Sequence, residues 1–109
     1  MVKNYEFPKV NAYLENNKYV IEANVAGWPK DKIHLEIEEQ NGHVNLYING
    51  EDLEKRNLVL QELERRAFYR VFKLEGVQSD PKAKLEGGIL KIVFNVVKTE
   101  PVKKVLTIS

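Results

Sequence analysis

At residues 83–90 the chain reads Ala-Lys-Leu-Glu-Gly-Gly-Ile-Leu, which predicts two β-strands joined by a tight glycine turn. Further on, past a short charged tether, Leu106-Thr107-Ile108 places two aliphatic side chains one residue apart. In an extended peptide both side chains point to the same side, so both can enter one groove. Together the two features indicate a self-assembling binding domain rather than a catalytic one.

Alternation of apolar and polar residues extends over much of the remaining chain, with the period of strands that bury one face. The clearest run is Ile33–Glu38, and similar runs cover 19–25, 44–48, 68–74 and 89–96. Turn signals separate these runs at Gly27–Asp31, Asn41-Gly42, Asn49-Gly50, Gly76 and Asp80-Pro81. Several short strands with this spacing predict an all-β sandwich.

Composition fits one small domain of 109 residues, with 43% apolar and 30% charged residues. No apolar run approaches the roughly 20 residues that span a bilayer, and no secretory signal is evident, so we expect no membrane partner. The absence of cysteine excludes disulfides and thiolate metal sites, which fits a cytoplasmic protein. A net charge of +1, from 17 basic and 16 acidic residues, does not favour nucleic-acid binding.

Catalytic and metal-binding patterns are missing from the sequence. The only serines, Ser79 and Ser109, lie in a turn and at the end of the sequence, without a plausible base. His34 and His43 lack the acidic cluster expected of a metal site, and Gly87-Gly88 is a β-turn rather than a phosphate loop. We therefore predict no enzyme, no cofactor and no metal. Trp28, next to a proline, is expected to plug one end of the sandwich, with an exposed interaction role as the alternative.

Residues 52–66 do not follow the strand pattern. Good helix formers occur throughout, and Leu53, Val59, Leu60 and Leu63 lie near one side of a helical wheel. Local propensity favours a helix, whereas a long charged loop with a short extended piece at 58–60 is the alternative. The residues alone leave both open.

Several motifs resemble those of the α-crystallin domain, the core of the small heat-shock proteins. Residues 83–90 are similar to the family's Ala-x-x-x-Asn-Gly-Val-Leu, and residues 46–51 to its Leu-x-Ile-x-Gly-Glu. Residues 25–33 resemble Leu-Pro-Gly-Val-x-x-x-Asp-Ile, with Ala26 in place of proline. Residues 64–74 resemble Glu-Arg…Phe-x-Arg-x-Phe-x-Leu, closest to the bacterial inclusion-body-binding branch. The resemblance runs from about Pro8 to Ser109.

This resemblance implies an immunoglobulin-like sandwich of seven or eight strands with a strand-swapping loop. The implied parts are a short N-terminal segment (1–7), an α-crystallin domain (8–98) and a C-terminal extension (99–109). The loop is residues 51–66, and its swapped strand is Leu58-Val59-Leu60, so the extended form replaces the helix. Because family members usually carry a long hydrophobic N-terminal arm, the short segment 1–7 indicates a minimal or trimmed member with weaker chaperone activity.

The resemblance also assigns roles to single residues. Leu106 and Ile108 become a tail docking motif, with a last strand of the same sandwich as the alternative. The groove that receives them is assigned to Leu35, Ile37 and Leu85, which are otherwise ordinary core.

Arg70 shares a strand face with Phe68 and Phe72, and a buried arginine there needs a carboxylate. The resemblance makes Arg70 an ion-pair residue of the dimer interface. The alternative is an exposed edge arginine that stacks on a ring.

The implied function is that of an ATP-independent chaperone, a holdase that keeps non-native proteins from aggregating. Its partners would be unfolded clients and a second copy of the chain, with larger homo-oligomers assembled through the tail. Two rival functions stay open: a monomeric co-chaperone-type adaptor, and a structural assembly module that binds no clients.

Overall fold

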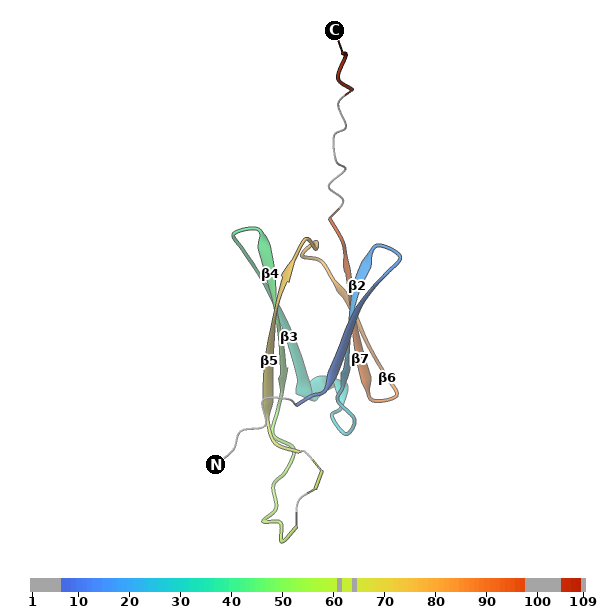
Figure 1. Ribbon diagram of the computed structural model, residues 1–109. Helices are drawn as coiled ribbons and strands as arrows, with labels where there is room; N and C mark the ends of the chain where they lie inside the picture. Colours follow the sequence, from blue (N-terminus) through green and yellow to red (C-terminus); the bar gives the residue numbers. More distant parts are fainter. Residues whose placement is uncertain (1–6, 61, 64, 98–104, 109) are drawn as a thin grey trace.

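The computed structural model describes residues 7–60, 62–63, 65–97 and 105–108, and the described part is a sandwich of two antiparallel sheets (Figure 1). One sheet has the order β1-β2-β7-β6 and the other the order β3-β4-β5. The strands of the first are Val10–Glu15 (β1), Lys18–Asn24 (β2), Ile89–Asn95 (β7) and Lys82–Glu86 (β6). Those of the second are Ile33–Gln40 (β3), His43–Gly50 (β4) and Phe68–Glu75 (β5). A short 3-10 helix, η1 (Lys30–Lys32), leads into β3. The predicted all-β sandwich is confirmed.

The hairpin turns follow from residues that tolerate a left-handed backbone. Between β3 and β4, Asn41 and Gly42 have φ of 48° and 83°. Between β6 and β7, Gly87 and Gly88 have φ of 59° and 80°. Two positive φ values in succession are the geometry of a tight hairpin turn whose twist matches the flanking strands. The glycine turn predicted at residues 83–90 is therefore present.

The core lies between the sheets and is built from the inward positions of the alternating runs. In β2, Ile21 and Ala23 are fully buried, whereas Asn24 is exposed. In β4, the buried positions alternate with half-buried ones along the whole strand. The core cluster contains Ile21, Ala23, Val25, Trp28, Val44, Leu46, Ile48, Phe68, Leu74, Val77, Leu90, Ile92 and Phe94. Period-2 burial explains why these segments form strands.

Trp28 closes one end of the sandwich, as predicted. Its side chain is 3% exposed, and its ring lies 5.2 Å from that of Phe7 and 5.1 Å from that of Phe68. The indole Nε1 donates a hydrogen bond of 2.8 Å to the backbone oxygen of Glu51. A buried tryptophan needs such a partner for its polar nitrogen. The bond fixes the start of loop 51–66 to the core.

Two features of the fold differ from the sequence interpretation. Strand β1 was not foreseen, because its residues do not alternate cleanly; Asn16 and Asn17, both at positive φ, form the turn that pairs it with β2. Asn49-Gly50 is not a turn but the end of β4. Gly50 is buried opposite Phe68, whose ring occupies the space that a side chain would need.

Candidate functional site

An apolar groove lies between β3 and β6, which are edge strands of the two different sheets. Its volume is about 260 Å³, and Leu35 and Leu85, two of the three predicted groove residues, line it. Ile37, the third, is not among the lining residues and is 36% exposed further along β3. The complete lining is Lys30, Ile33, Leu35, Ala83, Lys84, Leu85 and Leu90.

Sequence reasoning missed Ile33 and Leu90 as groove residues, although the signals were present. Ile33 lies two residues before Leu35 and therefore on the same face of β3. Leu90 is the direct cross-strand partner of Leu85 in the β6–β7 hairpin. The register of the two hairpins thus places four aliphatic side chains in one groove that is open to solvent.

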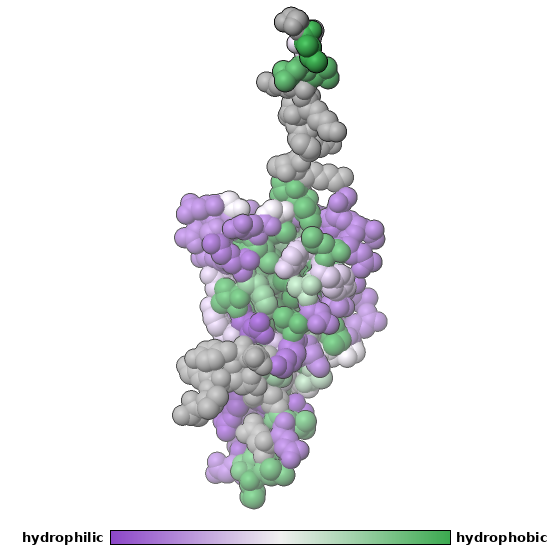
Figure 2. Space-filling model, in the orientation of Figure 1, coloured by the Kyte–Doolittle hydropathy of each residue, from purple (hydrophilic) through white to green (hydrophobic). Residues whose placement is uncertain are grey.

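The tail residues are almost fully exposed. Leu106 is 86% and Ile108 is 96% exposed, and residues 105–108 adopt no regular secondary structure. Figure 2 shows this segment as a hydrophobic (green) end of the chain, beyond the sandwich. Residues 105–108 therefore do not form a last strand of their own sandwich here. The tether residues 99–104 lie outside the described residues.

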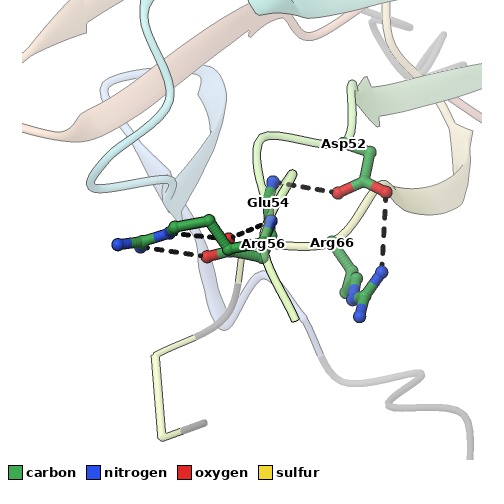
Figure 3. A network of polar contacts seen from close by, with 4 residues as sticks. All are labelled: Asp52, Glu54, Arg56 and Arg66. Atoms are coloured by element: carbon green, nitrogen blue, oxygen red, sulfur yellow. Dashed lines mark hydrogen bonds and ion pairs between the residues drawn. The ribbon is translucent and has the colours of Figure 1, made fainter. Parts of the chain in front are cut away.

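Loop 51–66 has a base that is held together by polar contacts (Figure 3). The backbone N–H of Leu53 donates to the oxygen of Arg65 at 2.8 Å, which draws the two ends of the loop together. Asp52 accepts a bond from the backbone N–H of Glu54 at 3.1 Å and lies 3.8 Å from the guanidinium of Arg66. These contacts replace the bonds between residues four apart that a helix would need.

Glu54 is a carboxylate within this loop base that the sequence did not single out. It is 7% exposed, and its Oε1 accepts bonds from the backbone N–H of Arg56 at 2.8 Å and from the Nε of Arg56 at 3.1 Å. Bonds from the Arg56 side chain, and next from its backbone, hold the pKa of Glu54 below its ordinary value of 4.5. The carboxylate therefore fixes the chain locally between residues 54 and 56.

The far part of the loop is apolar and exposed. Leu58, Val59 and Leu60 are 37%, 106% and 74% exposed, and Leu63 is 67% exposed. The described residues between 51 and 66 form neither a helix nor a strand, so the predicted strand at 58–60 is not formed within this single chain. Sequence propensity for a helix is overridden because the base contacts close the segment into a loop. The loop thus presents apolar side chains that no described residue of this chain covers.

Arg70 lies on the inner side of β5 beside Phe72, as expected, and within this single chain it contacts a carbonyl and a ring. Its Nη1 donates a bond of 2.7 Å to the backbone oxygen of Pro8, and its guanidinium carbon lies 4.9 Å from the centre of the Phe72 ring. A carbonyl and a ring, rather than a carboxylate, offset the cost of its partial burial. The interface role of Arg70 stays a prediction.

The His34 side chain contacts a single carboxylate. Its Nε2 lies 2.7 Å from Oε2 of Glu51, whose other oxygen is 3.7 Å from the ammonium of Lys32. The bond to His34 is the largest cause that lowers the pKa of Glu51. Among the described residues, no three His, Cys, Asp or Glu side chains gather where they could hold a metal ion. Nor does the described part contain a helix long and apolar enough to cross a membrane.

Comparison with known proteins agrees with the arrangement of the two sheets. A sequence profile of the Hsp20/alpha crystallin family matches residues 11–109. One relative is the peroxisomal 15.7 kDa heat shock protein of Arabidopsis thaliana, which is 37% identical; the match covers 72% of this chain and 64% of the relative. This chain thus matches less than two thirds of that relative's length.

Solved structures share the same fold. A small heat-shock protein from Xylella fastidiosa superposes with a TM-score of 0.70 at 22% identity, covering 94% of this chain and 96% of that one. A mutant of hsp14.1 from Sulfolobus solfataricus gives 0.70 at 28% identity, covering 91% and 79%.

The fold and the profile together define an α-crystallin domain. The chain belongs to the Hsp20/alpha crystallin family, whose members are chaperones rather than enzymes. The three similar proteins named above come from a plant, a bacterium and an archaeon, and they do not single out the inclusion-body-binding branch, which stays a prediction.

Proposed function

We propose that this chain is an ATP-independent holdase, which binds apolar segments of non-native proteins and so keeps them from aggregating. One observation carries the proposal: an apolar groove of about 260 Å³ coexists with tail residues Leu106 and Ile108, which are 86% and 96% exposed. Monomeric soluble proteins rarely leave such apolar surfaces open without a partner. When clients are absent, the tail residues Leu106 and Ile108 of one copy would cover the groove of another.

The tail of one copy would dock in the groove of another. Burying each aliphatic side chain contributes roughly 1.5–3 kcal/mol, whereas association costs about 4–15 kcal/mol. A single dock is therefore weak, and several docks within one assembly reinforce each other through effective concentration. Weak individual docks let the tail leave the groove when a client competes.

The dimer would form through the exposed part of loop 51–66. In the described part of the chain, β1 pairs only with β2, so its other edge can accept an added strand. Leu58, Val59 and Leu60 of a second copy are the segment that we propose pairs there. Arg70 stays a proposed interface residue, and an unchanged dimer dissociation constant in Arg70→Ala would argue against that role.

The holdase proposal is tested by heating a thermally unstable enzyme with the purified chain, without nucleotide, and following light scattering. We expect scattering to fall as the chain approaches equimolar amounts, and to fall less with a chain in which Leu35 and Leu85 are replaced by Ser. An equal amount of serum albumin controls for crowding. A chain that dimerises but leaves aggregation unchanged would support the structural assembly module instead.

Cytoplasmic location stays a prediction that rests on the absence of cysteine. The Arabidopsis relative is described as peroxisomal. Fluorescence microscopy of a tagged chain in its own cells decides between the compartments.

A further inference from the structure

The groove between β3 and β6 carries charge of one sign. Lys30, at the start of η1, and Lys84, in β6, line it together with Ile33, Leu35, Leu85, Leu90 and Ala83. Among the described residues that line the groove there is no carboxylate. An apolar floor with a cationic lining favours a ligand that combines aliphatic side chains with negative charge.

The carboxylate that pairs with the lining lysine Lys84 does not remove this bias. The ammonium of Lys84 lies 2.8 Å from Oε2 of Glu86, but the two side chains are 76% and 74% exposed. Ion pairs with such exposure contribute little, because water and salt screen them and both side chains lose freedom. Lys84 can therefore exchange Glu86 for a carboxylate of a bound peptide at little cost.

The chain's own tail has the wrong charge for this groove. Lys103 and Lys104 immediately precede Val105 and the docking pair. An extended chain advances about 3.3 Å per residue, so these lysines lie roughly 7–10 Å before Leu106. With Leu106 in the groove, these lysines would lie about one Debye length of 8 Å from it at physiological salt, so repulsion from the lysines that line the groove is weakened but not abolished.

We propose that the groove binds apolar segments flanked by Asp or Glu more tightly than it binds the chain's own basic tail. The inference rests on the proposed docking of peptides in this groove and names the kind of segment that docks best. The tail then binds the groove with lower affinity, and non-native segments with acidic flanks displace it. Specificity arises from the lining lysines, whereas the aliphatic floor supplies the apolar contact common to both occupants.

Fluorescence anisotropy with the full chain and dye-labelled peptides tests the proposal. One peptide has the sequence of residues 99–109, a second carries Lys103→Glu and Lys104→Glu, and a third carries Leu106→Ala and Ile108→Ala as background. We expect the acidic peptide to bind about three- to tenfold more tightly than the first at low salt. Since the Debye length is only about 3 Å at 1 M salt, the difference disappears there.

Charge reversal in the groove provides the matched control. A chain with Lys30→Glu and Lys84→Glu is expected to prefer the basic peptide, whereas Lys73→Glu, on the exposed face of β5, leaves the preference unchanged. Equal binding of the acidic and basic peptides overturns the charge preference but leaves docking intact. If neither of the first two peptides, which both keep Leu106 and Ile108, binds more tightly than the third, the proposed docking is overturned as well.

Discussion

Glu54 shows how one carboxylate can shape a long loop. It is 7% exposed, while the guanidinium that it binds belongs to Arg56, a side chain 79% exposed. The bonds from Arg56 favour the ionised carboxylate, which is why its pKa lies below the ordinary value of 4.5. A charge held in this way orders residues 54–56 near the base of loop 51–66.

The lowered pKa of Glu54 predicts a pH dependence. The ionised form stabilises the folded chain at pH values above 4.5, and this contribution is lost as the pH falls from 4.5 through the folded-state pKa. We expect Glu54→Gln to lower Tm at pH 7 and to make the fall of Tm below pH 4.5 shallower. Calorimetry from pH 3 to pH 7 measures both, with Glu75→Gln, a change at an exposed residue of β5, as the control. Parallel curves for Glu54→Gln and the unaltered chain would contradict this role.

Gly50 is required by the ring of Phe68. A Cβ at Gly50 would overlap that ring, and both residues are buried. We expect Gly50→Ala to destabilise the fold by about 1–3 kcal/mol, because a packed core has no room for an added methyl group. Thermal unfolding would then show a Tm lower by at least about 4 °C.

A double variant checks the cause of that loss. Phe68→Leu frees space beside residue 50, so the combined loss in Gly50→Ala/Phe68→Leu should be smaller than the sum of the single losses. Strict additivity would show that the ring is not what excludes a side chain at Gly50.

At the scale of elements, period-2 alternation predicted five of the seven described strands, because each buries one face in the core. The glycine turn at residues 87–88 predicted a sixth, β6. The groove residues were predicted only in part, because Leu35 and Leu85 line the groove, whereas Ile37 does not. Where β3 passes β6 depends on the packing of two sheets, which no local pattern contains. The residues alone left helix and loop open over 51–66 for a related reason, since contacts such as Leu53 with Arg65 join residues distant in the sequence.

The exposed segment 58–60 leads to a prediction about association rather than folding. Val59 is 106% exposed, so Val59→Asp should change the free energy of unfolding by no more than about 0.5 kcal/mol. If this segment pairs with β1 of a second copy, the buried aspartate weakens the dimer at least tenfold. Analytical ultracentrifugation measures the dimer dissociation constant, and Asn57→Asp, an exposed change in the same loop, serves as the control. An unaltered constant for Val59→Asp would exclude this segment from the interface.

At the scale of the whole molecule, Figure 1 draws the loop and the tail at opposite ends of the sandwich, and the groove is a third surface between the sheets. Three separate surfaces allow a dimer through the loop and larger assemblies through the tail. We expect these two proposed levels of assembly to be independent, because the loop residues and the groove residues do not overlap. Assembly size can then change while the dimer persists.

Independence of the two levels is measured by light scattering after size exclusion. We compare the intact chain, a chain ending at Lys98, and the double variant Leu106→Ala/Ile108→Ala. Removing the side chains of Leu106 and Ile108 removes the free energy of burying them in the groove, roughly 1.5–3 kcal/mol each. Both altered chains should therefore be dimers, while the intact chain forms larger species. Val105→Ala/Thr107→Ala changes the residues on the other side of the extended tail and should assemble like the intact chain. If all of these chains were monomers, the proposal of a dimeric chaperone would be excluded, and a monomeric co-chaperone-type adaptor would be the better proposal for the function.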